Sequence, residues 1–229
     1  IMDASFLLLP DMLPAAALRR APFSRQTGPS DEPTMHVRRY GAGQHVFSTG
    51  DPAICIHEVA QGTVLVSRYL SDGRRQIVDI IGPGRLFGFA SGTHGCTAEV
   101  VVPAMICSLD REAATHSPIV AERALRAMVQ EIEHLRDLAL LLGRKTASER
   151  VTTMLAKLAG DDPAHAVLLT LPVTRGEIAD YLGLTVETVS RTFGRLKQAG
   201  LIEVPSNERV NILDLPRLRR LADGLEGEV

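Results

Sequence analysis

The stretch LPVTRGEIADYLGLTVETVSRTFGRLKQAG, residues 171–200, decides the fold. Apolar side chains recur in it at helical spacing and predict two short helices, with Gly183 in a tight turn between them. Thr185 can cap the second helix, and Gly200 can end it. Two β-like runs that flank Pro205 follow and predict a hairpin. The pattern therefore indicates a winged helix-turn-helix over residues 144–229.

The second helix of this motif carries a polar face. The spacing of Glu187, Ser190 and Arg191 places them together, opposite an apolar face. Arginine can donate two hydrogen bonds to guanine, and glutamate can accept one from cytosine. We therefore expect these three side chains to read bases of double-stranded DNA, and an ordinary exposed Glu187–Arg191 pair is the weaker alternative. The expected backbone-contacting or supporting residues are Thr174, Arg175, Thr185, Val186, Thr188, Arg195 and Lys197.

Upstream of the motif, residues 35–116 predict a β-roll of the jelly-roll type. Short β-like runs are punctuated by glycine, at 45–48, 54–60, 63–69, 75–81 and 98–109. Ser71-Asp72-Gly73 predicts a hairpin turn, and Gly82-Pro83-Gly84 cannot continue a strand. Residues 1–34 precede this domain and are rich in Pro, Ser, Gly and Asp, which predicts a loosely docked arm.

Residues 117–143 predict a long helix that begins at Pro118, with Ser117 as its cap, and reaches Leu142. One edge of this helix repeats apolar residues with spacings of four and three, as in a coiled-coil seam: Ala121, Leu125, Met128, Ile132, Leu135, Ala139 and Leu142. The edge could pack on the chain's own β-roll. The helix has enough apolar surface for both contacts, so we expect a parallel homodimer. Residues 143–146 then predict a hinge, and 147–159 a further helix.

Composition narrows the class of protein. With 229 residues and 45% hydrophobic content, the chain can form two cores, and the sequence shows no apolar run long enough to span a bilayer and no secretory signal. We therefore expect a cytoplasmic protein. The formal net charge of −2 is uninformative about DNA binding, because a basic footprint can occupy one face alone. Three cysteines without a C-x-x-C pair indicate reduced thiols and no complete cysteine metal site.

These motifs together resemble the CRP/FNR superfamily of bacterial transcription regulators. The resemblance covers nearly the whole chain and includes the helix-turn-helix at 173–196 and the β-roll motifs at 41–51, 61–64 and 84–89. Glu187, Ser190 and Arg191 match the FNR and FixK branch. The resemblance implies an α+β fold with a cyclic-nucleotide-binding-like β-roll, a dimerisation helix and a winged helix-turn-helix. It also implies an activator without enzymatic activity that binds palindromes of the type TTGAT-N4-ATCAA and contacts RNA polymerase through loops such as that at Asp72-Gly73. The FixK-like targets would be microaerobic, anaerobic, nitrogen-fixation or denitrification genes.

Departures from the superfamily bear on cofactors. Phe89 and Cys96-Thr97 stand where the cyclic-nucleotide-binding branch has a Glu and an Arg-Ser pair, so we expect no bound cAMP. The N-terminal cysteines of the iron-sulfur sensor are missing, and Cys107 alone cannot hold a cluster. We therefore predict a regulator without cofactor or metal. The alternatives are gating by an unidentified small molecule, redox control through Cys96, and a cupin-like metalloenzyme built on His45, His57 and His94.

Overall fold

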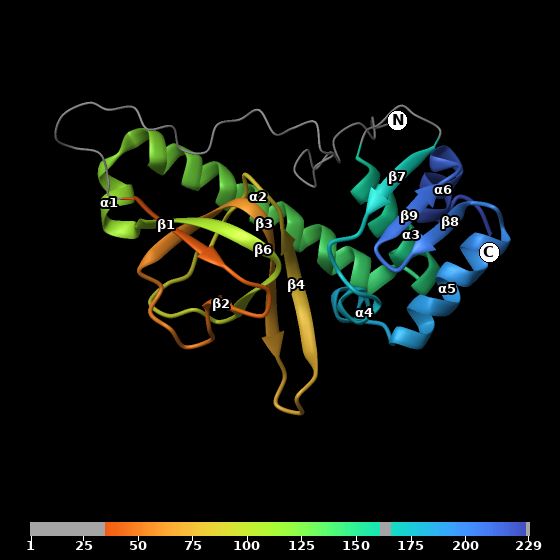
Figure 1. Cartoon of the computed structure of the whole chain (residues 1–229), viewed down its shortest axis with the longest axis horizontal. Coiled ribbons are helices and arrows are strands. Elements are labelled where there is room, and N and C mark those ends of the chain that lie inside the picture. The colour runs from red at the N-terminus through yellow and green to blue at the C-terminus, as the bar shows by residue number, and fades with distance from the viewer. Residues whose placement is uncertain (1–34, 161–165, 228–229) are drawn as a thin grey trace. The chain divides into compact units, whose positions relative to one another are not determined.

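The computed structural model describes residues 35–160 and 166–227 (Figure 1). The chain divides after Leu138 into a β-rich unit and a helical unit. The fold is α+β, with a β-roll first, then a long helix, then a winged helix-turn-helix, as the sequence predicts. The predicted arm over 1–34 lies outside the described residues.

The β-roll is an antiparallel sheet in the order β1-β6-β3-β4, with β2 paired to β6 and β5 paired to β3. Its core consists of side chains from the inner faces of these strands, among them the fully buried Val59, Val64, Val100 and Ile106. The strands are β1 Met35–Tyr40, β2 His45–Phe47, β3 Cys55–Tyr69, β4 Arg75–Ile81, β5 Leu86–Phe87 and β6 Thr97–Asp110.

Strand β3 corrects one sequence prediction. The runs predicted as separate strands at 54–60 and 63–69 form one strand, and the punctuation between them is a series of register shifts against β6. Gly62 lies among these shifts with a φ of 90°. A Cβ atom at this position would lie 2.5 Å from the carbonyl oxygen of Pro103 and 2.6 Å from the Cα atom of Ala104. The glycine therefore marks a close approach of β6 within a continuous strand, not a loop.

Both predicted turns are present. The hairpin between β3 and β4 closes through a 2.8 Å hydrogen bond from the Leu70 N–H to the Arg74 carbonyl, and its tip projects beyond the rest of the roll (Figure 1). Gly73 at the tip has a φ of 85°, a conformation that favours glycine. Strand β4 ends at Ile81, directly before the predicted glycine-proline-glycine turn.

Two helices follow the roll. The short helix α1, Arg111–His116, was not predicted, and Asp110 caps it by accepting from two backbone N–H groups. Helix α2, Pro118–Arg144, begins where predicted. Ser117, expected to cap it, lies between the helices as the C-cap of α1. The break expected over 143–146 is present but shorter, because α2 continues through Gly143 to Arg144 and only Lys145 and Thr146 separate it from the next helix.

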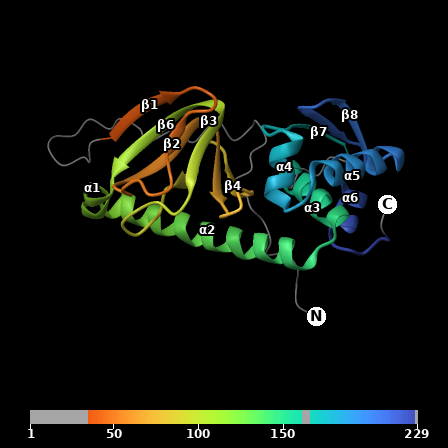
Figure 2. The same ribbon diagram turned by 90° about the horizontal axis from the view of Figure 1, so that it is seen from below.

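One edge of α2, its inner edge, packs on the roll; Figure 2 shows the helix running along the strands. Arg123 forms an ion pair with Glu58 of β3 at 3.2 Å. Farther along the helix, the His134 Nε2 atom lies 3.2 Å from the carbonyl oxygen of Val78 and 3.3 Å from the carboxylate of Asp79. These polar contacts fix which edge of α2 faces the sheet and therefore which edge faces outward.

The helical unit contains α3 Ala147–Ala159, β7 Val167–Thr170, α4 Arg175–Leu182, α5 Val186–Gln198, β8 Ile202–Ser206, β9 Arg209–Ile212 and α6 Leu215–Ala222. Helix α3 has the predicted bounds, and the predicted wing is present as β8 and β9. Strand β7 and helix α6 were not predicted. Strand β7 pairs with β9 and makes the wing a three-stranded sheet in the order β7-β9-β8.

A buried histidine makes the stability of the roll dependent on pH. His57 lies in the core against the Phe47 and Phe87 rings, and its Nδ1 atom is 2.8 Å from the hydroxyl oxygen of Ser108. Burial, with a smaller contribution from the charge of His94, lowers the pKa of His57 to about 4 from 6.5. Between about pH 4 and pH 6.5, His57 is therefore protonated in the unfolded chain but neutral in the folded chain, so folding releases a proton.

We expect the free energy of unfolding to fall as the pH is lowered through this window, and the His57 contribution between pH 7 and pH 5 is about 2 kcal/mol. The measurement is urea unfolding of the full chain at several pH values. The control is His57→Asn, which preserves a hydrogen-bonding group near Ser108 but does not titrate. A wild-type pH slope equal to that of the variant would contradict the prediction.

Candidate nucleic-acid interface

The turn between α4 and α5 is built from the residues that the sequence indicates. Thr174 caps α4 in a reciprocal capping box with Glu177. Gly183 ends α4 in the left-handed conformation, with a φ of 61°. Thr185 then caps α5, its hydroxyl accepting from the Thr188 N–H at 3.2 Å. Both helices of the motif therefore start at fixed residues, which fixes where the side chains of α5 project.

Arg150 of α3 holds the end of α4 in place, a role that sequence analysis missed. Its guanidinium donates to the carbonyl oxygens of Leu182, Lys145 and Leu142 at 2.9, 2.9 and 2.8 Å. Leu182 is the last residue of α4, so Arg150 satisfies a helix-end carbonyl next to the turn. No local signal could have revealed this contact, because Arg150 and Leu182 are far apart in the sequence.

Helix α5 has one buried face and one exposed face. Val189, Phe193 and Leu196 are buried, as predicted, and Thr192 joins them by donating a hydrogen bond to the Thr188 carbonyl. The opposite face is exposed and contains Glu187, Ser190, Arg191, Arg195 and Lys197. The structure therefore brings the three expected base-reading residues together on one solvent-facing surface.

The Glu187–Arg191 pair is weak. The closest oxygen and nitrogen atoms are 3.9 Å apart, and the side chains are 78% and 63% exposed. Such an exposed pair within one helix contributes a few tenths of a kcal/mol. Stabilising α5 is therefore a minor role for these two residues, and both side chains remain available to a partner.

Arg175, at the start of α4, differs from the other expected backbone-contacting residues because it is half-buried. Its guanidinium carbon lies 3.5 Å above the centre of the Phe193 ring, and its Nη1 atom is buried without a hydrogen-bond partner among the described residues. Burial lowers the pKa of Arg175. The stacked guanidinium therefore links α4 to α5 and retains an unused donor nitrogen.

The remaining supporting residues divide into two groups. The hydroxyls of Thr174 and Thr185 accept from backbone N–H groups at the starts of α4 and α5. The hydroxyl oxygens of Thr185 and Thr188 are 2.9 Å apart. Val186, the first residue of α5, is half-exposed beside Glu187. These residues shape the start of the exposed face of α5, whereas Arg195 and Lys197 provide positive charge farther along it.

The predicted seam lies along the outer side of α2, and one of its residues, Leu135, also lines a pocket between α2 and the sheet. Ala121, Leu125, Met128, Ile132, Leu135 and Ala139 are exposed, and Leu142 is partly buried. Leu125, Met128, Ile132 and Leu135 are all substantially exposed, and a run of exposed apolar side chains, unlike a single one, is typical of an interaction surface. Within a single chain this strip is an apolar surface without a covering element among the described residues.

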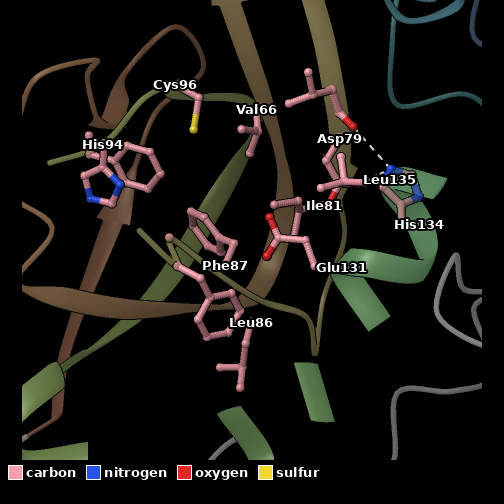
Figure 3. Close-up of a pocket in the computed structure, with 14 residues that line it drawn as sticks. Val66, Asp79, Ile81, Leu86, Phe87, His94, Cys96, Glu131, His134 and Leu135 are labelled. Carbon is pink, nitrogen blue, oxygen red and sulfur yellow. Dashed lines mark hydrogen bonds and ion pairs between the residues drawn. The ribbon is translucent and has the colours of Figure 1, made fainter. Parts of the chain in front are cut away.

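A pocket in the β-rich unit lies between the sheet and α2 (Figure 3). Its lining is mostly apolar and includes Phe47, Phe87 and Phe89, and Glu131 of α2 points into it. Burial raises the pKa of Glu131, and the charge of Asp79 adds a smaller increase. Nearby Arg85 acts in the opposite direction, but the net shift is upward. None of the described lining residues is Arg or Lys. The pocket is therefore poorly suited to a ligand with a phosphate group.

Cys96, the residue considered for redox control, also lines this pocket. Burial raises the pKa of its thiol, and the carboxylate of Glu131 acts in the same direction. The reactive form of cysteine is the thiolate, which a raised pKa disfavours at neutral pH. The surroundings of Cys96 therefore do not resemble those of an activated cysteine.

Of the histidines considered for a metal site, His57 and His94 both pack on the Phe47 ring, whereas His45 lies apart beside Ser48. His94 is buried and stacked on Phe47 with 3.6 Å between ring centres, His57 contacts Ser108, and His45 is exposed. Within residues 35–160 and 166–227, no group of three or more His, Cys, Asp or Glu side chains is arranged to hold a metal ion. The same residues include no helix with the length and apolar character needed to cross a membrane.

Comparison with known proteins connects this geometry to a family. The sequence model of the Crp-like helix-turn-helix domain matches residues 149–221, and that of the cyclic nucleotide-binding domain matches residues 37–116. The transcriptional activator protein FnrL of Cereibacter sphaeroides is 34% identical over 200 residues, covering 82% of this chain and 80% of FnrL. The nitrogen fixation regulation protein FixK of Rhizobium meliloti is 35% identical over 189 residues, covering 82% and 87%.

A solved structure is similar over the same extent. FixK2 from Bradyrhizobium japonicum superposes with a TM-score of 0.74 at 34% identity, covering 82% of this chain and 97% of that one. Both domain types and their order are therefore shared with proteins whose names describe transcription regulators. The chain belongs to the CRP/FNR family of transcription regulators, in which it is similar to FixK and FnrL.

Proposed function

We propose that the protein is a homodimeric transcription activator that acts in the cytoplasm and binds two-fold symmetric DNA of the type TTGAT-N4-ATCAA. Its targets would be FixK-like, namely microaerobic, anaerobic, nitrogen-fixation or denitrification genes. The observation that carries the proposal is the exposed polar face of α5, where Glu187, Ser190 and Arg191 project from a helix whose other face is fully packed. A helix presented in this way fits the major groove.

Each of the three residues has a distinct role in the proposed complex. Arg191 donates two hydrogen bonds to the O6 and N7 atoms of guanine, and Glu187 accepts from the N4 amino group of cytosine. Ser190 can donate or accept at the base between them. Because the Glu187–Arg191 ion pair is long and exposed, separating the two side chains costs little.

Contacts to phosphates set the register without reading sequence. Lys197 and Arg195 are exposed on α5, and Arg175 holds a buried, unpaired nitrogen at the start of α4. Thr174 precedes Arg175 at the start of α4, and Thr188 lies in the first turn of α5, where backbone N–H groups also favour anions.

The exposed strip on α2 supports a homodimer. Two copies paired through Leu125, Met128, Ile132 and Leu135 would cover apolar side chains that a single chain leaves in water. A two-fold symmetric pair can place two recognition helices in successive major grooves, about one turn of DNA apart. The symmetry of the proposed operator follows from this pairing.

The β3–β4 hairpin supports a contact with RNA polymerase. Asp72 and Gly73 are exposed at its tip, and the Asp72 carboxylate holds Arg74 in an ion pair at 2.8 Å. A tight, ordered turn that projects from the roll is a surface that a second protein can reach when DNA is bound. The proposal of polymerase as that protein rests on family resemblance.

We propose that activation does not need cAMP or an iron-sulfur cluster. A cyclic phosphate in the pocket would face the carboxylates of Glu131 and Asp79, and no described lining residue offers it a cation. The three cysteines of the chain cannot supply the four thiolates of a typical cluster. Gating by an uncharged small molecule is compatible with the apolar lining, and a rise in melting temperature with such a compound would reveal it.

The proposed function is tested by a gel shift of the full chain with a TTGAT-N4-ATCAA duplex and a scrambled duplex of equal composition. We expect the symmetric duplex to bind at least a hundredfold more tightly, since specific and random affinities differ by about 10³ or more in such regulators. Equal affinities at every salt concentration would refute it.

Removing the two kinds of DNA contact should have different effects. Arg191→Ala should lower discrimination at one guanine of each half-site by about 1–3 kcal/mol. Lys197→Ala is the matched control: it should weaken all duplexes similarly and reduce the salt slope by about 0.9 for each phosphate that the lysine no longer neutralises. The measurement is a set of binding curves on operator and single-base variants from low to moderate salt. An unchanged specificity ratio in Arg191→Ala would reject the base-reading role.

The seam is tested by placing a charge in it. Leu135→Asp should produce monomers that bind the operator poorly, because pairing would bury an unpaired carboxylate. Gln130→Asp adds the same charge to α2 at an exposed position away from the seam and should remain dimeric. Light scattering and sedimentation measure the mass. A Leu135→Asp protein that stays dimeric would exclude this seam.

A further inference from the structure

Helix α5 contains a glycine at an unfavourable place. Gly194 lies well inside Val186–Gln198, more than one turn from either end. Glycine in a helix interior destabilises the helix by about 0.5–1 kcal/mol relative to alanine, because its backbone loses more freedom on folding. A recognition helix that has to present side chains in fixed positions is a costly site for such a residue.

Nothing within the described chain requires glycine there. Gly194 is not among the glycines with positive φ, and a Cβ atom built on it meets no heavy atom within 4 Å. Other glycines are different. Gly62 would clash with β6 at 2.5 Å, and Gly183 holds the left-handed conformation that ends α4. The fold therefore explains those glycines and leaves Gly194 unexplained.

The position of Gly194 on the helix points to DNA. It follows Arg191 by three residues and Ser190 by four, so it shares their face, and it lies two turns after Glu187 at about 100° per residue. Leu196, on the buried side, is nearly opposite. Gly194 is exposed in the centre of the surface that the proposed function directs into the major groove.

We propose that Gly194 is a positioning residue that lets the DNA approach the main chain of α5 more closely than any side chain would allow. The inference rests on the proposed function. A methyl group extends from Cα by a bond of about 1.5 Å. Hydrogen bonds from Arg191 to guanine require donor–acceptor distances of about 2.7–3.2 Å, so displacing the helix outward by even part of that length weakens them. The bare backbone at Gly194 thus sets the depth at which the base-reading side chains work.

The experiment uses Gly194→Ala and Gly194→Leu in the full chain, with two measurements whose expected directions are opposite. Both new residues favour helices, so the urea midpoint should rise. Operator affinity should fall, by at least fivefold for Ala and by at least twentyfold for Leu, as the added side chain grows. Gly143→Ala is the matched control, since Gly143 is an exposed helical glycine of α2 with nothing within 4 Å of its Cβ position. It should remain dimeric by light scattering and leave operator affinity unchanged.

Each result has a definite meaning. Operator affinity that is unchanged or improved in both Gly194 variants, with a wild type that binds the operator well, would overturn the inference and leave the proposed function standing. Weaker binding together with a lower urea midpoint would also overturn it, because the glycine would then serve the fold. A wild type without preference for the symmetric duplex would instead refute the proposed function on which the inference rests.

Discussion

The recognition surface depends on the burial of one face of α5. Val189, Phe193 and Leu196 are almost completely removed from water, and each such side chain stabilises the folded state by about 1.5–3 kcal/mol. This packing leaves the helix a single orientation within its unit. The side chains on the opposite face are then presented together, even though no strong contact among them holds them there. The fixed orientation of the exposed polar face therefore comes from the apolar side of the helix.

Much of the helical unit could be predicted from sequence, because its signals are local. Thr146, Thr174 and Thr185 each precede a helix and accept from a backbone N–H within the first turn. Gly183 takes the left-handed conformation that its place after an apolar run suggests. Strand β7 has only four residues, which are too few to show a clear alternation. Helix α6, in contrast, carries local signals that the prediction missed: Asp214 caps it, a proline lies in its first turn, and the buried Leu215, Leu218 and Leu221 recur at helical spacing.

The β-roll shows where local patterns mislead. Gly62 resembles a turn residue in sequence, yet it lies within the long strand β3, where it accommodates β6. Gly143 looks like a helix breaker, but an exposed helical glycine costs only about 1 kcal/mol, which packing of the rest of α2 exceeds. For the candidate site, the grouping of Glu187, Ser190 and Arg191 on one exposed face follows from helical spacing alone. Arg150, the stacking of Arg175 on Phe193 and the inward position of Glu131 all depend on contacts between distant segments, which periodicity does not reveal.

Arg150 also determines where the regulator could be recombined with another protein. Two of its three acceptors, the carbonyls of Leu142 and Lys145, precede α3 in the chain. A chimera joined at residue 146 would retain the arginine, while the path of its acceptor backbone would depend on the foreign sequence. The third acceptor, the carbonyl of Leu182, lies at the end of α4. An N–H group of Arg150 that is left buried without an acceptor would cost about 1–3 kcal/mol of stability. A junction placed before Leu142 would transfer Arg150 together with all three of its acceptors. The position of α4, which precedes α5, would then be preserved in the chimera.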